Sequence, residues 1–370
     1  MRKAEFFPNI DRMNKESSLL LIKQLSEASA PSGFEDEAVN AIRYQGIGLG
    51  NFREDAMRNL YLNRWGNKPD LPVLLLDAHS DEVGFMIRAV RPNGLLEFVS
   101  LGGWIACNIP AQRLLIRNRD GKWIPGIVAS KPPHFLSEAD KKQAPEISEM
   151  AIDVGASSDT EIREDYRIAI GAPAVPDVSF DYNPERDTMM GKAFDDRLGC
   201  AAILALLREL DGVELSVQLA AAFAAQEELG LRGATVTAQI VKPDIAISFE
   251  GCPADDTLGQ SQVVQTALKK GPMLRHFDMR MVTNPRFQRF ALDVAEKFGI
   301  PVQEAVRTGG STNAGVIHLS GKAVPTIVIG LPVRYIHTHY GIASYSDFEW
   351  TVKLGSEVIK GLDERVIAGF

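Results

Sequence analysis

The stretch Phe223-Ala224-Ala225-Gln226-Glu227-Glu228-Leu229-Gly230 joins the end of an apolar run to two adjacent carboxylates. The run starts at Leu215 and ends at Ala225, which is typical of a strand buried between helices. Two charges at the end of such a strand are costly unless a cation or a reaction uses them. The pair Glu227 and Glu228 therefore indicates a functional site.

Other polar residues occupy equivalent places along the chain. Each one follows an apolar run or, in one case, opens a helical pattern. In doubly wound sheets, ligands bind beyond the carboxyl ends of the strands, so we expect these side chains to converge with the glutamate pair. They are His79, Asp81, Asp195, Glu250 and His337.

Composition describes an ordinary globular protein and narrows its partners. The 370 residues are 45% apolar and 24% charged, and the net charge of −8 disfavours nucleic acid. Residues 1–15 lack an apolar signal core, and no stretch approaches the length of a membrane span. Cys107, Cys200 and Cys252 fit neither a disulfide framework nor a zinc finger. We therefore expect a cytoplasmic protein whose cysteines are packing residues.

Periodicity predicts α/β alternation at both ends of the chain. Capping boxes at Ser32–Glu35 and Ser346–Glu349 are expected to open helices that end near residues 44 and 362. The other predicted helices are Ser18–Ser29, Arg197–Leu210 and Pro285–Phe298. The predicted strands are Asn59–Asn63, Val73–Leu76, Leu215–Ala225, Ile245–Phe249 and Ala323–Ile329.

The character of the sequence changes after Gly84. Short alternating segments with turn signals continue to about residue 173, and a polar segment at 131–149 predicts a long surface loop. We therefore predict an α/β domain of residues 1–84 and 184–370, interrupted by an all-β domain at 85–183.

The candidate residues suit a hydrolase that uses metal ions. Imidazole and carboxylate ligands with few thiolates favour zinc, cobalt or manganese. Two such ions, ~3.5–4 Å apart, need a bridging carboxylate and together clamp water and a carbonyl. A carboxylate beside that water takes its proton and passes it to a leaving amine. One residue of the pair Glu227 and Glu228 would bind metal and the other would act on the water.

Motifs along nearly the whole chain resemble the glutamyl aminopeptidase, or tetrahedral aminopeptidase, family of two-metal peptidases, to which a cellulase label has also been attached. They are Ala30-Pro31-Ser32-Gly33, Ala78-His79-Ser80-Asp81-Glu82-Val83-Gly84, Lys131-Pro132-Pro133-His134, Ile152-Asp153-Val154-Gly155-Ala156, Gly191-Lys192-Ala193-Phe194-Asp195-Asp196-Arg197, Gln226-Glu227-Glu228-Leu229-Gly230, Arg307-Thr308-Gly309-Gly310 and Arg334-Tyr335-Ile336-His337. The order and spacing of these motifs match as well.

The resemblance implies a role for each candidate. His79 and His337 would be terminal ligands on opposite metals, and Asp195 would bridge the two ions. Glu228 and Glu250 would complete the ligand set. Glu227 would be the general base, and Asp81 would orient His79.

The resemblance also implies an architecture and an activity. The expected fold is an α/β/α domain with a mixed central sheet, interrupted by a barrel or PDZ-like β domain. That β domain would build homo-oligomers, either dimers or hollow dodecamers. The expected reaction removes N-terminal residues from short peptides through a water between the metals. The family includes members specific for acidic, basic and neutral side chains, so the preferred side chain stays open.

Three departures from the family pattern matter. The family has Asp where Glu250 stands, and Asp in place of Asn313 in its Gly-Thr-Asp-Ala motif. The longer Glu side chain would shift metal geometry, and the lost charge would weaken a contact near the substrate. Thr338-His339-Tyr340 replaces Ser-Pro after His337, so His339 is an alternative ligand.

Other interpretations remain at this stage. The same site could serve a deacylase or carboxypeptidase, and Glu250 and Asn313 motivate a degenerate homologue that binds peptides without cleaving them. A cellulase would leave the histidine ligands without a role. We expect Asp196 to cap a helix. His134 would line an entrance or have no chemical role.

Overall fold

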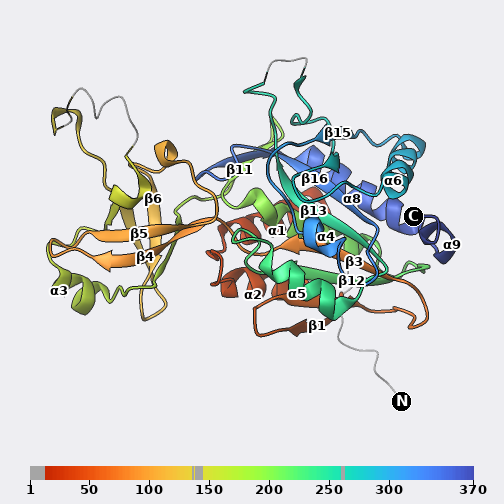
Figure 1. Cartoon of the computed structure of the whole chain (residues 1–370), viewed down its shortest axis with the longest axis horizontal. Coiled ribbons are helices and arrows are strands. Elements are labelled where there is room, and N and C mark those ends of the chain that lie inside the picture. The colour runs from red at the N-terminus through yellow and green to blue at the C-terminus, as the bar shows by residue number, and fades with distance from the viewer. Residues whose placement is uncertain (1–12, 136, 138–144, 260–262) are drawn as a thin grey trace.

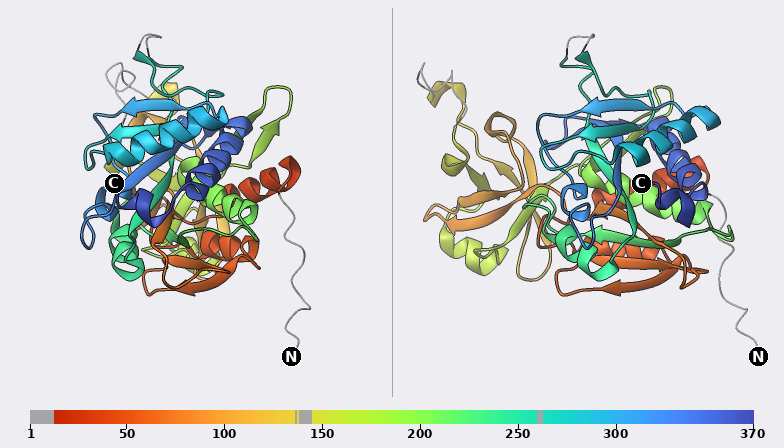
Figure 2. Two further views of the ribbon diagram at one scale, coloured as in Figure 1. Left: turned by 90° about the vertical axis from the view of Figure 1, so that its right-hand side faces the viewer. Right: turned by 45° about the vertical axis from the view of Figure 1, so that its right-hand side comes forward.

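The computed structural model describes residues 13–135, 137, 145–259 and 263–370. The chain forms a large α/β body and a smaller β lobe that stands beside it (Figure 1). Two further views show the same separation into lobes, with helices on both sides of the sheet in the body (Figure 2). The predicted class, an α/β fold with an all-β insert, is confirmed.

One mixed sheet organises the body, and eleven strands of the described residues belong to it. Its main path runs β1-β2-β12-β3-β13-β16-β17-β11-β10, with β14 and β15 attached beside β16. The strands are β1 (Gly50–Glu54), β2 (Leu60–Arg64), β3 (Val73–His79), β10 (Asp181–Asn183), β11 (Thr188–Gly191), β12 (Gln218–Ala224), β13 (Ile245–Pro253), β14 (Met273–Phe277), β15 (Gln303–Val306), β16 (Thr326–Arg334) and β17 (Gly341–Ser344).

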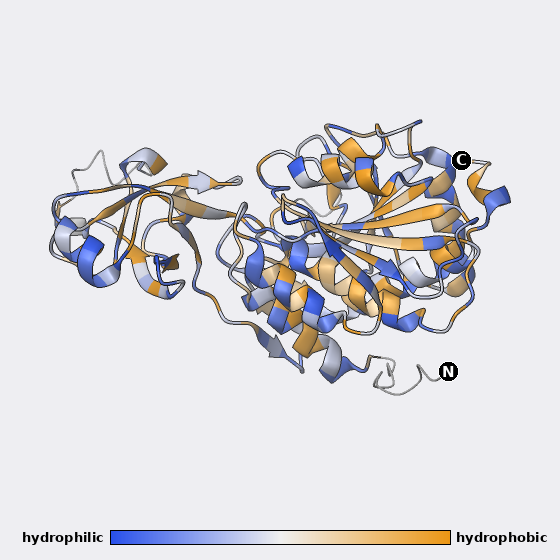
Figure 3. Cartoon of the chain, turned by 90° about the horizontal axis from the view of Figure 1, so that it is seen from below, coloured by the Kyte–Doolittle hydropathy of each residue, from blue (hydrophilic) through white to orange (hydrophobic). Residues whose placement is uncertain are grey.

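The four central strands β12, β3, β13 and β16 are parallel. They are apolar along most of their length (Figure 3), because helices cover both faces. One face packs on α1 (Lys15–Glu27), α2 (Asp36–Gln45), α4 (Phe194–Glu209), α6 (Pro285–Phe298) and α8 (Tyr345–Lys360). The other packs on α5 (Arg232–Val241) and α7 (Ala314–Ile317). The short helix α9 (Glu364–Ile367) ends the chain.

The β lobe is a closed antiparallel barrel in the order β4-β5-β8-β7-β6-β9. Its core contains Phe85, Phe98, Leu114 and Ile152, and the helical turn α3 (Asp159–Glu161) lies outside the barrel sheet. The strands are β4 (Gly84–Val90), β5 (Leu96–Leu101), β6 (Arg113–Arg117), β7 (Trp123–Val128), β8 (Ala151–Asp153) and β9 (Pro173–Pro176). The domain limits at 84 and 184 stay a proposal. Part of the loop predicted at 131–149 lies outside the described residues.

Both predicted capping boxes are wrong. The N-cap of α2 is Glu35 and that of α8 is Ser344, and neither makes a side-chain cap hydrogen bond. The Ser32 hydroxyl donates instead to Asp81 at 2.6 Å, and Glu35 accepts from backbone N–H groups outside the helix. The sequence resembles a capping box, but the side chains of Ser32 and Glu35 make tertiary hydrogen bonds instead.

The strand that carries Glu250 is longer than predicted. Pairing with β16 continues through Pro253, so Glu250 lies inside β13 rather than after it. The apolar run ends at Phe249, but the neighbouring strand keeps the backbone extended. By contrast, helix α6 has the predicted bounds, Pro285–Phe298, because Asn284 caps it and Pro285 occupies its first turn.

Candidate metal centre

Parallel strands bring the candidate residues to one edge of the sheet. His79 is the last residue of β3, and Glu227 and Glu228 follow β12, which pairs with β3 in register from Val73 to His79. On the other side of β3, strand β13 contributes Glu250. His337 follows β16, three residues beyond its end at Arg334. The predicted convergence is therefore present.

Asp195 stands between the two histidines. It lies in the first turn of α4, where its backbone is not helical, and its side chain turns toward the strand ends. One carboxylate oxygen is 3.1 Å from Nε2 of His79, and the other is 3.5 Å from Nε2 of His337. A carboxylate with one oxygen toward each imidazole has the arrangement that a bridge between two cations requires.

The described residues contain three groups whose possible ligand atoms lie within 4.8 Å of one another. Asp195 belongs to two of them and His79 to two. The groups are His79 with Asp195 and Glu250, Asp195 with Glu228 and His337, and His79 with Glu227 and Glu228. The five sequence-predicted ligands and Glu227 thus form one cluster.

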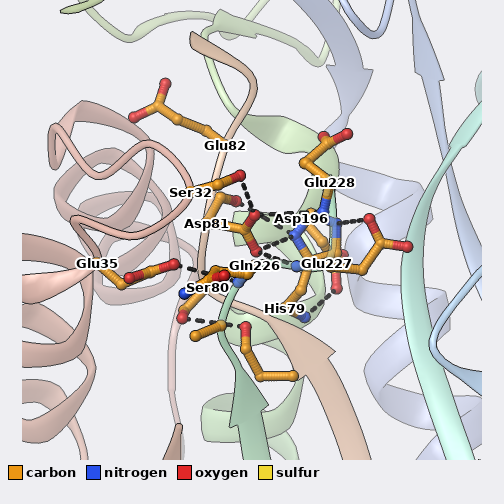
Figure 4. Close-up of polar contacts among 12 residues, drawn as sticks. Ser32, Glu35, His79, Ser80, Asp81, Glu82, Asp196, Gln226, Glu227 and Glu228 are labelled. Carbon is orange, nitrogen blue, oxygen red and sulfur yellow. Dashed lines mark hydrogen bonds and ion pairs between the residues drawn. The ribbon is translucent and has the colours of Figure 1, made fainter. Parts of the chain in front are cut away.

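Asp81 supports the cluster from behind (Figure 4). Nδ1 of His79 is 3.2 Å from the backbone oxygen of Asp81 and 3.4 Å from its Oδ1, so Asp81 can hold the ring with Nε2 facing Asp195. The same carboxylate accepts the N–H groups of Glu227 at 2.9 Å and Glu228 at 3.3 Å. Asp81 therefore fixes both His79 and the segment that carries Glu227 and Glu228.

Asp196 accepts the N–H of Gly199 at 3.0 Å, as expected for a residue that caps a helix. It also accepts the N–H groups of His79 and Gly251, which belong to two strands. Its side chain thus ties the start of α4 to β3 and β13.

Burial disfavours the charged form of the acidic groups. It raises the pKa of Glu227 to about 8 and of Glu228 to about 7, and it raises the pKa of Glu250 well above the usual range. Burial opposes charge on His337 too, but Asp195 and Glu228 raise its pKa to about 9. Desolvation would raise the pKa of Asp195, yet the two histidines hold it below its usual value.

This donor set could hold divalent cations. Glu228 Oε1 and Glu250 Oε2 are buried and have no hydrogen-bond partner in the part of the chain that the structure describes. Such oxygens are costly unless a cation uses them. A ligating imidazole must be neutral, and the carboxylates beside His79 and His337 raise the pKa of both rings, so cations would compete with protons there.

His339, the alternative ligand, and His134 both lie outside the cluster. His339 is buried, neither ring nitrogen has a hydrogen-bond partner within the described ranges, and it packs edge-on against Trp104 at 5.2 Å. Burial lowers its pKa to about 4. His134 is exposed on the short helix Pro133–Phe135 of the β lobe. The structure therefore places His337, not His339, beside Asp195.

A cavity of about 490 Å³ opens beside the cluster. Gly309 and Gly310 line it, and Gly103 contributes from the β lobe. Arg275 and Arg307 also line it, and sequence reasoning assigned neither a role. A charged arginine inside the mostly apolar strand β14 is the feature of the sequence that could have indicated a functional role for Arg275.

Two of the three departures from the family pattern, Glu250 and Asn313, lie at different depths. Glu250 lines the cavity. Asn313 is fully buried, and its side-chain oxygen and nitrogen have no hydrogen-bond partner among the described residues. The charge missing at Asn313 would therefore affect groups packed behind the cavity wall, not a group on the wall itself.

Comparison with known proteins places the chain in a family. A model of the M42 glutamyl aminopeptidase family matches residues 59–354. The chain is 33% identical to glutamyl aminopeptidase of Lactococcus lactis subsp. cremoris, over 94% of this chain and 97% of that protein. No helix of the described residues is long and apolar enough to cross a membrane.

Solved structures agree with this assignment. A TET aminopeptidase of a marine sediment Thaumarchaeota archaeon superposes with a TM-score of 0.91 at 36% identity, covering 95% of this chain and 99% of that one. The TET1 peptidase of Pyrococcus horikoshii, which can assemble into a tetrahedron or a large octahedral shell, has a TM-score of 0.84 at 25% identity, covering 94% and 100%. The chain belongs to the M42 glutamyl aminopeptidase family and is a hydrolase that acts on peptide bonds.

Proposed function

We propose that this aminopeptidase depends on two divalent cations and removes N-terminal residues from short peptides, with Glu227 as the general base. The observation that carries the proposal is the position of Asp195, with one oxygen toward His79 and the other toward His337. This arrangement supports one site at His79, Asp195 and Glu250 and another at Asp195, Glu228 and His337. Zinc, cobalt and manganese suit this ligand set.

Glu227 is well placed for proton transfer. Bound cations would lower the pKa of a water to about 7 and polarise the substrate carbonyl. Oε2 of Glu227 lies 4.0 Å from Nε2 of His79, at the cavity wall and beside the proposed ligands. The carboxylate would take the proton of the attacking water and deliver it to the leaving amine. Asp81 would keep the imidazole of His79 oriented during both transfers.

Two arginines support a preference for an acidic N-terminal residue. Arg275 is 4% exposed, and its Nη1 donates to Asp278 at 3.2 Å. Arg307 donates to Asp255 at 2.8 Å. Both guanidinium groups are thus already paired with aspartates, and their Nε atoms are buried, so a substrate would reach them through their Nη atoms. A substrate carboxylate entering the cavity would meet guanidinium groups, which bind carboxylates in a planar, bidentate way.

The assembly and location are also proposals. We propose a homo-oligomer, a dimer or a dodecamer, in which the β lobe at 85–183 contributes contacts, because the similar TET1 peptidase assembles into shells. We propose a cytoplasmic location, as expected from the cysteine content.

The test is release of N-terminal residues by protein stripped with a chelator and then supplied with cobalt, zinc or manganese. Peptides beginning with Glu, Lys or Leu form the panel, and N-acetylated copies are the controls. We expect cleavage of unblocked peptides only, only with metal, and fastest with Glu. Cleavage of the acetylated set would favour a deacylase or carboxypeptidase. Absence of cleavage with every metal would favour a protein that only binds peptides.

A further inference from the structure

Four consecutive backbone N–H groups, those of residues 225–228, donate to side-chain oxygens from three distant segments. These residues link the end of β12 to the glutamate pair. The contacts are Ala225 to Asn59 Oδ1 at 2.8 Å, Gln226 to Glu35 Oε1 at 3.1 Å, Glu227 to Asp81 Oδ1 at 2.9 Å, and Glu228 to Asp81 Oδ2 at 3.3 Å.

The backbone at this link needs such partners. Strand β12 ends at Ala224, and Gln226 has a φ of 53°, in the left-handed region that a residue with a side chain rarely adopts. Unpaired buried N–H groups destabilise a fold, so this conformation persists only where its surroundings determine it. The three acceptor side chains hold the backbone in this conformation.

The acceptors at the first two positions are themselves fixed. Asn59 is fully buried, and its amide nitrogen donates to Asp55 at 2.8 Å, which turns Oδ1 toward Ala225. Glu35 is also fully buried, and its Oε1 accepts the N–H of Gly33 at 2.7 Å in addition to that of Gln226. Figure 4 shows Glu35 and Asp81 approaching the link from the same side.

We propose that Glu35 and Asn59 are positioning residues of the peptidase reaction. They hold the backbone at Gln226 and Ala225, and through it they set where the carboxylate of Glu227 stands relative to His79 and Asp195. The inference rests on the proposed role of Glu227. A displacement of about 1 Å at a reacting group can lower a rate by about 100-fold, so a small loosening of this link has a large effect on kcat.

The first test compares Glu35→Ala, Glu35→Gln and Asn59→Ala with the parent protein, at full metal loading. We expect kcat to fall about 10- to 100-fold in the two alanine variants, with KM and metal content nearly unchanged. Glu35→Gln keeps an oxygen acceptor in the same place, so most of the loss should be restored.

Asp347→Ala is the matched control. Asp347 is a buried carboxylate that accepts two backbone N–H groups, those of Lys269 and Gly271, and it does not line the cavity. We expect thermal stability to fall as it does in Glu35→Ala, while kcat stays near that of the parent. If Glu35→Ala loses stability but keeps kcat as the control does, Glu35 has only a structural role and the inference is wrong.

The second test is the double variant Glu35→Ala with Glu227→Gln. If Glu35 acts through Glu227, the double variant should be no slower than Glu227→Gln alone. Losses that multiply would overturn the inference. If Glu35→Ala does not fold, the same comparison is made with Asn59→Ala in place of Glu35→Ala, and its result tests the inference. A parent protein without metal-dependent activity would instead contradict the proposed function.

Discussion

The cluster has an inner half and an outer half that are built differently. The inner half comprises His79, Asp81, Glu227 and Glu250, which lie on or after β3, β12 and β13, with exposures of 1% for the His79 side chain and 0% for Asp81. The outer half is His337, whose side chain is 38% exposed. Its segment follows β16 and bends through left-handed conformations at Tyr335 and His337.

The difference lies in what fixes each side chain. Hydrogen bonds fix the side chains of His79 and Asp81 and the backbone of Glu227 without any cation. The ion pairs of His337 within the described residues are with the carboxylates of Asp195 and Glu228, at 3.5 and 3.4 Å. The inner half is therefore preorganised by the fold, whereas the position of the outer half depends on the charges at the centre.

The largest expected effect concerns the chemistry of the inner half. Glu227→Gln keeps the shape of the side chain but removes the base, so we expect kcat to fall about 10²- to 10⁴-fold. Metal content, measured by atomic absorption, should not change. Glu250→Gln is the companion variant, and there we expect metal content to fall. Near-normal turnover by Glu227→Gln would exclude it as the base.

The next effect concerns the stability of each half in the metal-free protein. His79→Ala removes a buried imidazole that contacts both Asp81 and Asp195, which should cost about 3–5 kcal/mol of unfolding free energy. His337→Ala removes a partly exposed pair and should cost about 0–1 kcal/mol. Urea unfolding followed by circular dichroism measures both. Equal losses would show that the two halves are not built differently.

A smaller effect distinguishes His339 from His337 on the same segment. Burial lowers the pKa of His339 from 6.5 to about 4, so the unfolded chain binds a proton that the folded chain does not. The contribution of neutral His339 to the unfolding free energy is complete above pH 6.5. It is lost as pH falls toward 4, to a total of about 3 kcal/mol.

His339→Phe should remove this pH dependence, since a phenyl ring has no proton to gain. The comparison is the unfolding free energy of parent and variant at pH 7 and pH 5. An unchanged difference between the two proteins at both pH values would mean that His339 is not held neutral in the fold.

Much of the site followed from local sequence. An apolar run that ends in charged residues predicts a strand end at a sheet edge, and His79 and the glutamate pair lie at such ends. Glu250 was predicted after its strand and lies within it, because pairing with β16 extends the strand beyond its apolar run. Arg275 was missed because one strand by itself does not reveal which cavity its side chain faces.

The sequence by itself determined the α/β class, the β insert and the set of residues that meet at the sheet edge, because burial periodicity and charge at strand ends are local properties. Only the tertiary structure decided between His337 and His339, since both follow the same strand and differ in what packs on them. It also decided that Ser32 and Glu35 do not form a capping box. Their partners, Asp81 and Gln226, are distant in sequence, and no local pattern records such contacts.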